Sequence, residues 1–167
     1  MPEKKTIERA KKDRREGKSA STQAGEFVLE EFEHIREGKH GARSPEQAIA
    51  IGLSEARRAG VDLPPPKKGK ASEKTITQAE RDRKAAKKGT SRKPSSTRSR
   101  ATKKALKREG HAAASTQAVA RHARKAARQR SPGERSAAAR KAARTKGASK
   151  RSAAAKKAAR TRANRNR

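Results

Sequence analysis

Large hydrophobic residues occur at helical spacing only in the first 63 positions of the chain. Val28, Phe32 and Ile35 stand at positions i, i+4 and i+7, so their side chains share one face of a helix. This spacing predicts a helix over residues 21–37, with glutamates in its first half, where negative charge suits the helix dipole. The same region therefore holds the apolar surface from which a core can form.

A second helix in this region carries signals at both of its ends. Ser44 as N-cap, Pro45 in the first turn and Gln47 three residues after the cap form a capping box. Gly60 follows the helix in the position where a glycine commonly ends one. Together the two helices predict a helical hairpin over residues 21–63.

Six large side chains form the candidate packing surface or interface of this hairpin, and they are Phe27, Val28, Phe32, Ile35, Ile49 and Leu53. A lone hairpin of this size is marginally stable. Either a charged helix over residues 3–16, which carries Ile7, completes its core, or the hairpin forms a homodimer or docks on an unknown protein. A helix-turn-helix DNA reader, with Ser44–Ala59 as recognition helix, is a further alternative. Its loop is longer than usual for that motif, and its recognition helix would begin with a glutamate.

Beyond residue 63 the large apolar side chains are restricted to Ile76, Leu106 and Val119. Low hydrophobicity combined with high net charge is typical of disorder. We therefore predict a mostly α-helical class: a small helical hairpin of two to three helices, followed by a long basic, largely disordered tail with short Ala/Arg/Lys helices.

Charge divides the chain at the same place. Residues 1–63 hold 13 Lys and Arg against 12 Asp and Glu, whereas residues 64–167 hold 35 against 5. The expected parts are a charged N-terminal helix (1–20), the hairpin domain (21–63), a basic disordered linker (64–114) and basic repeats (115–167).

The last of these parts repeats every 16 residues, with KAAR at 125–128, 141–144 and 157–160. Its basic residues are spaced so that a helix would present them as one cationic stripe. The candidate nucleic-acid-binding residues are Arg121, Arg124, Lys125, Arg128, Arg140, Lys141, Arg144, Lys156, Lys157, Arg160 and Arg162. Because like charges at this spacing repel and each repeat is short, we expect partial helix at most in water.

A net charge of +31, nearly all of it after residue 63, predicts binding to a phosphate polymer. Alanine-lined helices lack the side chains that read base edges, so binding is expected to ignore sequence. We expect a nucleoid-associated, histone-like protein of the cytoplasm that binds duplex DNA. Binding to RNA or the ribosome is the second choice. Neither a membrane partner nor a cofactor is expected, because no apolar stretch is long enough to span a bilayer and no cofactor motif is present.

The histidines raise the question of a metal site. Glu33, His34, Glu37 and His40 are of the right residue types, but His40 lies in a glycine loop and no further ligand converges on it. The chain has no cysteine. The sequence therefore predicts no metal site, and the absence of catalytic motifs predicts no enzyme.

The run EFVLEEFEHIREGKHGARSPEQAIAIGLSEARRAGVDLPPPKKG at residues 26–69 carries a family resemblance. Its REGKHGAR turn and QAIAIGLS helix resemble a bacterial family catalogued as domain of unknown function 6496, over about residues 1–70. The resemblance implies a bacterial source and brings no established activity. The tail is also loosely similar in composition to linker-histone tails and to the Lys/Ala-rich tails of bacterial nucleoid proteins.

Overall fold

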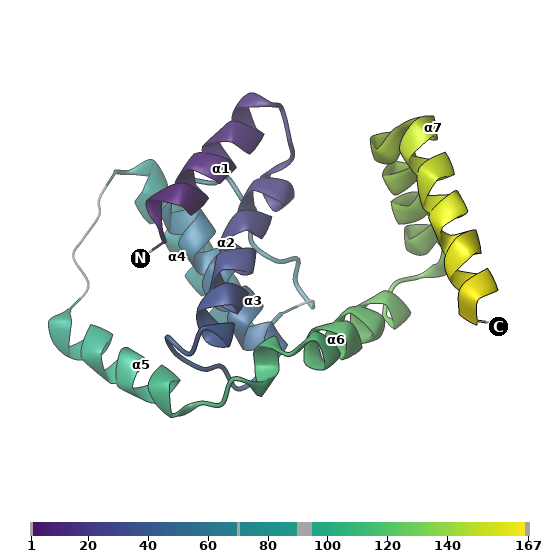
Figure 1. The fold of residues 1–167 in the computed structure, drawn as a ribbon. Coiled ribbons are helices and arrows are strands. Elements are labelled where there is room, and N and C mark those ends of the chain that lie inside the picture. The colour runs from purple at the N-terminus through teal and green to yellow at the C-terminus, as the bar shows by residue number, and fades with distance from the viewer. Residues whose placement is uncertain (1, 70, 90–94, 166–167) are drawn as a thin grey trace. The chain divides into compact units, whose positions relative to one another are not determined.

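The computed structural model describes residues 2–69, 71–89 and 95–165. Over these residues the elements are α1 (Lys4–Arg15), α2 (Ala20–Arg36), α3 (Pro45–Arg58), α4 (Glu73–Lys87), α5 (Ser96–Arg108), the 3-10 helix η1 (Ala112–Ala114), α6 (Thr116–Arg128) and α7 (Pro132–Arg165) (Figure 1). The chain divides into an N-terminal unit, Met1–His122, and a C-terminal unit, Ala123–Arg167. None of the helices in the described ranges combines the length and the apolar character that crossing a bilayer requires.

The expectation of a small hairpin followed by a largely disordered tail is wrong. Helices α4 to α7 fill most of the described chain after Leu63, and α4 and η1 pack on the hairpin helices. The expectation counted only large apolar side chains as core-forming. Alanine also forms a core where backbones approach closely, and Ala79, Ala113 and Ala114 are buried.

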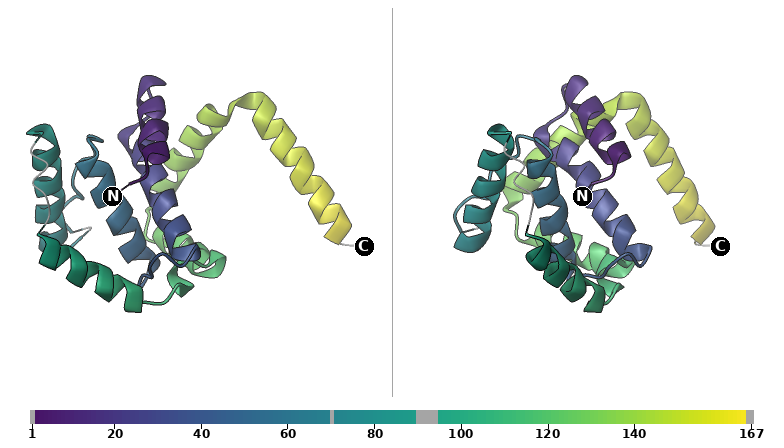
Figure 2. Two further views of the ribbon diagram at one scale, coloured as in Figure 1. Left: turned by 60° about the vertical axis from the view of Figure 1, so that its left-hand side comes forward. Right: turned by 90° about the vertical axis from the view of Figure 1, so that its left-hand side faces the viewer.

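Helices α1, α2 and α3 lie side by side and enclose the first of two apolar clusters (Figure 2). This cluster joins Ala10 of α1, Phe27 of α2 and Ala56 of α3, with Ile7 and Leu53 packed against it. The charged first helix therefore completes the hairpin core within one chain, which is one of the alternatives that the sequence left open.

The second cluster connects the hairpin to a segment far along the chain. Phe32 and Ile35 of α2 pack with Ala48 of α3 and with Ala113 and Ala114 of η1. Of the six side chains expected in the hairpin surface, Phe27, Phe32 and Ile35 are buried, while Val28, Ile49 and Leu53 are half-buried. All six therefore pack, fully or in part, inside the N-terminal unit.

A glycine sets the distance between α2 and α3. A Cβ atom at Gly52 would lie 2.7 Å from the Cα atom of Val28, closer than real Cβ contacts. The crossing of these two helices therefore requires a residue without a side chain at this position.

Both ends of α3 follow their local signals with one difference. The Ser44 hydroxyl accepts the backbone N–H of Gln47 at 3.3 Å, as a capping box requires. The Gln47 side chain, however, accepts the backbone N–H of Arg43 at 2.8 Å. Gly60 takes a positive φ of 92° after the helix, and Val61 turns back to become buried.

Helix α4 is fastened to α3 by polar contacts. Asp82, which is 7% exposed, accepts hydrogen bonds from Ser54 of α3 and from Gln78 of its own helix. Arg58 of α3 lies 3.4 Å from the same carboxylate. The segment expected to be a disordered linker therefore begins with a helix that rests on the hairpin.

The glycine loop between α2 and α3 meets the chain that follows α5. Gly41 donates its backbone N–H to Leu106 O at 2.9 Å, and Ala42 donates to Gly110 O at 3.1 Å. A Cβ at Gly41 would lie 1.9 Å from Glu109 O, so no larger residue fits. The REGKHGAR turn thus holds a distant segment against the hairpin.

The C-terminal unit contains the end of α6 and all of α7. The helix α7 is interrupted at Gly147, which has φ 68° and ψ 166°. The two nearly identical repeats, residues 136–146 and 152–162, fall on either side of this glycine. The expectation of partial helix at most is therefore not met. Alanine, lysine and arginine all have high helix propensity, and each half of α7 is longer than the 11-residue repeat that it contains.

Candidate nucleic-acid interface

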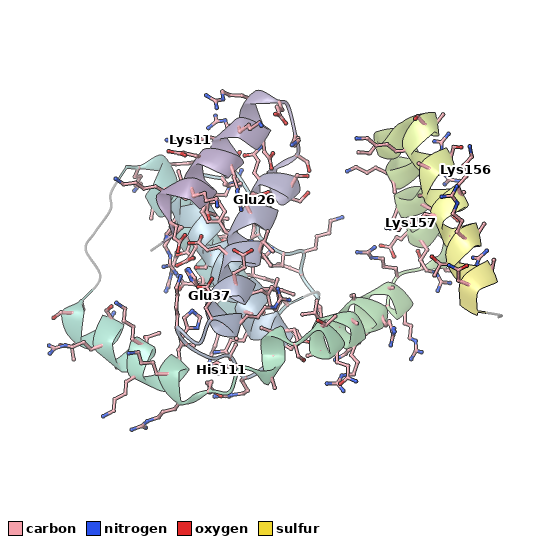
Figure 3. All side chains as sticks on the ribbon, in the orientation of Figure 1. Lys11, Glu26, Glu37, His111, Lys156 and Lys157 are labelled. Atoms are coloured by element: carbon pink, nitrogen blue, oxygen red, sulfur yellow. The ribbon has the colours of Figure 1, made fainter. Side chains whose placement is uncertain are left out.

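Cations dominate the C-terminal unit. Residues 123–167 contain 17 Lys and Arg and one acidic residue, Glu134, which gives a net charge of +16. All eleven cations expected to contact phosphate lie in α6 or α7, and all are exposed. Figure 3 shows the side chains on these helices, with Lys156 and Lys157 labelled on α7.

Helical spacing gathers these cations as the sequence indicated. Within α6, Arg121, Arg124, Lys125 and Arg128 are separated by three, four and seven positions along one continuous helix. The groups in α7, which are Arg140, Lys141 and Arg144, and then Lys156, Lys157 and Arg160, repeat this spacing on either side of Gly147. Arg162 follows two residues after the second group.

The lone carboxylate of this unit has a structural task. Glu134 accepts the backbone N–H of Ser131 at 2.8 Å, and the Ser131 hydroxyl accepts the backbone N–H of Glu134 at 3.2 Å. This reciprocal pair is a capping box at the start of α7, with Pro132 as its first residue. The S-x-x-E spacing of Ser131 and Glu134 indicates this helix start in the sequence itself.

A second basic helix was missed because it lay in the supposed linker. Helix α5 carries six exposed cations and no acidic residue: Arg98, Arg100, Lys103, Lys104, Lys107 and Arg108. The run KKALKR could have indicated it, since lysine, alanine and leucine favour helix formation. These cations belong to the N-terminal unit.

The carboxylates of the N-terminal unit, by contrast, have cationic partners nearby. Asp62 is 2.6 Å from Arg83, whose hydrogen bond holds the pKa of the Asp62 carboxyl below its usual value. Glu46 at the start of α3 is held at a pKa of about 2, first by its backbone N–H and then by His122 and Ser44. Residues 1–122 hold 31 Lys and Arg against 16 Asp and Glu, so this unit is also positive, with a net charge of +15.

The start of α3 bears on the helix-turn-helix alternative. A recognition helix contacts bases through its N-terminal residues. Here that turn presents Glu46, whose carboxylate lies 3.0 Å from the His122 ring nitrogen. An anionic group at the point of base contact argues against α3 as a helix that recognises DNA bases.

The glutamates that raised the question of a metal site are not the ones that the fold places beside the histidines. Glu33 is exposed on α2, and Glu37 binds Lys39 at 3.0 Å. His34 and His40 do come together, with ring centroids 6.2 Å apart. Their nearest carboxylates are those of other residues.

Residues 31–68 match the model of a family described as "Family of unknown function (DUF6496)". The chain resembles this family over that segment. The match confirms the resemblance expected from the REGKHGAR turn and the QAIAIGLS helix, and it spans the end of α2, the glycine loop and α3. Comparisons with the curated proteins and with the solved structures found no match. The family's description assigns no activity.

Proposed function

We propose that this protein binds duplex DNA without sequence preference and acts as a nucleoid-associated, histone-like protein. The observation that supports the proposal is the C-terminal unit, in which 17 cations face a single carboxylate. Glu134 offsets one of these charges and leaves the unit with a net charge of +16.

The physical basis is release of the counterions that surround DNA. Each phosphate neutralised by a lysine or arginine contributes about −0.9 to the slope of log K against log salt on duplex DNA. If about eight cations of the chain engage phosphates, the slope is about −7. Affinity then falls steeply as salt rises, whatever the base sequence.

The helices suit backbone contact better than base readout. Alanines fill the positions between the cations in α7, and alanine offers no hydrogen bond to a base edge. Like charges at i and i+4 destabilise these helices in water, and phosphate relieves this repulsion. Binding and helix stability therefore reinforce each other.

We confine the proposal to nucleic acid. Leu29, which is 43% exposed, is the large apolar side chain that the described part of the chain leaves open to solvent. A single exposed leucine is ordinary for a protein surface. It gives no support to a docking face for a second copy or another protein.

The test compares two full-length variants that each lose six cations. In the first, Arg140, Lys141, Arg144, Lys156, Lys157 and Arg160 are replaced by Gln; in the matched control, the six cations of α5 are replaced by Gln. Glutamine keeps helix propensity while removing charge. Binding to a labelled duplex is measured by gel shift between about 50 and about 300 mM salt.

We expect the α7 variant to lose up to about 5 from the magnitude of the salt slope, and the α5 variant to lose less than half as much. Unrelated duplexes of equal length should bind with similar affinity. The proposal fails if the α7 variant keeps the wild-type slope, or if folded RNA displaces the duplex far more effectively than unlabelled DNA does.

A further inference from the structure

Two histidines and a glutamate meet where α2 ends and its loop begins. Glu31, His34 and His40 each place one oxygen or nitrogen atom within 4.8 Å of the others. The two imidazole rings are nearly perpendicular, with an interplanar angle of 77°. Two imidazoles and one carboxylate suit borderline divalent transition ions such as Zn²⁺.

The carboxylate of Glu31 is buried without a partner for one of its oxygens. Its side chain is 3% exposed, and Oε1 has no hydrogen-bond partner among the described residues. The neighbouring Glu30 side chain is 5% exposed, and its Oε2 atom is in the same situation over those residues. Buried polar atoms without partners are costly, and a bound ion is one of the few reasons for keeping them. The buried Glu31 carboxylate, which lies close to two imidazoles, points to a cation.

Nearby groups concentrate negative charge at this place. Burial, followed by the charges of Glu55 and Glu30, raises the pKa of the Glu31 carboxyl to about 7. Glu55 belongs to α3, whereas Glu30 lies on α2. A divalent ion would compensate this charge and favour the ionised carboxylate.

On each imidazole ring, a neighbouring oxygen acceptor determines which nitrogen carries the proton. His40 Nδ1 lies 3.2 Å from Gly41 O, and because a carbonyl can only accept, Nδ1 carries the proton. His40 Nε2, which keeps its lone pair, is 3.6 Å from Glu31 Oε2. His34 Nε2 is 3.2 Å from Glu3 Oε1, which leaves Nδ1 as its lone-pair nitrogen when the carboxylate is ionised. Such an acceptor on the far nitrogen is the usual companion of a metal-binding histidine.

We propose that Glu31, His34 and His40 bind one divalent transition ion of the Zn²⁺ class. In a tetrahedral site with ligands about 2.0–2.1 Å from zinc, neighbouring ligand atoms are about 3.3 Å apart. The 3.6 Å between Glu31 Oε2 and His40 Nε2 is close to this spacing, so small side-chain rotations complete the site. Glu30 lies 3.7 Å from His34 Nε2, beside Glu3, so it helps to orient the His34 ring.

The position of the site indicates a structural role. His40 belongs to the loop whose next residue, Gly41, bonds to Leu106 at the end of α5. An ion between α2 and this loop would therefore hold the loop in the conformation on which the later segment rests. Binding free energy of this kind adds to the free energy of unfolding.

The experiment titrates full-length protein, freed of metal with a chelator, with Co²⁺ and then with Zn²⁺. We expect one equivalent of Co²⁺ to give visible absorption typical of tetrahedral coordination, and Zn²⁺ to displace it. Because the chain has no cysteine, that spectrum would report nitrogen and oxygen ligands alone. Zn²⁺ should also raise Tm, whereas Mg²⁺ at the same concentration should not.

Matched variants assign the site. Glu31→Gln and His40→Gln should each weaken Co²⁺ binding by more than about tenfold. Glu33→Gln, which changes an exposed glutamate of the same helix, and His122→Gln, which changes a histidine of α6 that contacts Glu46, should leave binding unchanged.

Two results would overturn the proposal. One is binding that is absent, or that the site variants and control variants share equally. The other is a wild-type Tm that Zn²⁺ leaves unmoved at pH 8. In that case Glu31 is a buried acid and nothing more.

Discussion

In the N-terminal unit helices α1 to α4 rest on buried side chains, of which Phe27 is 1% and Ile35 0% exposed. In the C-terminal unit every described side chain is exposed except for two half-buried alanines, Ala126 and Ala143. Helices α1 to α4 therefore owe their stability to packing, and the C-terminal unit owes its helices to propensity and capping. A mutation that removes burial should act on one unit, and a mutation that removes a cap should act on the other.

The two units carry similar net charges, +15 and +16, but they differ in how many acidic residues accompany the cations. Acidic residues of the N-terminal unit are distributed among ion pairs such as Asp62–Arg83 and Arg43–Glu109. The C-terminal unit has Glu134 alone against 17 cations. Its unbalanced charge can be neutralised only from outside the unit, which is why it supports a proposal of phosphate binding.

The largest difference between the units should follow from Phe27→Ala. Removing this buried ring should lower the free energy of unfolding of the N-terminal unit by about 3–5 kcal/mol. Amide hydrogen exchange, read residue by residue, should show faster exchange in α1 to α3 and unchanged exchange in α7. Leu29→Ala, at an exposed position of the same helix, should cost under about 1 kcal/mol. Equal losses from both variants would contradict the packing account.

A change in the pH dependence of stability should follow from Glu31→Gln in metal-free protein. The pKa of Glu31 is raised from 4.5 to about 7 in the folded chain, so the folded state holds its proton more tightly than the unfolded state does. The contribution of this proton to the free energy of unfolding is complete below about pH 4.5 and is lost as pH rises through about 7. The total loss is up to about 3 kcal/mol.

Urea titrations at pH 5 and pH 8 measure this effect. Between pH 5 and pH 8 the variant should lose less free energy of unfolding than the wild type, because it has no Glu31 carboxyl to ionise. At pH 8 it should therefore be more stable than the wild type. Burial and the charges of Glu55 and Glu30 raise the pKa, whereas His34 acts in the opposite direction, and His40 also faces the carboxylate. Glu33→Gln should show the same pH dependence of stability as the wild type. If Glu33→Gln changed that dependence as much as Glu31→Gln does, Glu31 would not be its cause.

The smallest effect should come from Ser131→Ala, which removes the cap of α7. Loss of an N-cap serine costs about 1 kcal/mol of local helix stability. NMR chemical shifts should show fraying over the first turn of α7, with no change in the unfolding midpoint of the N-terminal unit. Ser136→Ala, inside the helix, should leave helicity equal or higher. Fraying in both variants would mean that the capping box is not what starts this helix.

Local signals were sufficient to locate the first helices. The expected helices over residues 3–16 and 21–37 agree closely with α1 and α2, and the Ser44 cap marks the start of α3. These signals work because apolar periodicity, caps and terminal glycines act within a few residues of one another.

The candidate metal ligands show where such reasoning stops. Residue types suggested Glu33 and Glu37 as partners of His34, but the ring that approaches His34 is that of His40 and the buried carboxylate is that of Glu31. Glu31 faces the core and Glu33 faces solvent, and their positions in the sequence alone do not say which glutamate is buried. That outcome depends on α3 and on the loop.

The sequence by itself determined where helices begin, where cations are concentrated and which residues repeat, because propensity, capping and charge are properties of neighbouring residues. Tertiary structure decided that Ala113, Ala114 and Asp82 become part of the folded N-terminal unit, and that Gly41 admits a distant backbone. Burial is a relation between segments far apart in the chain. It gives a small or charged residue a role that its own neighbourhood does not reveal.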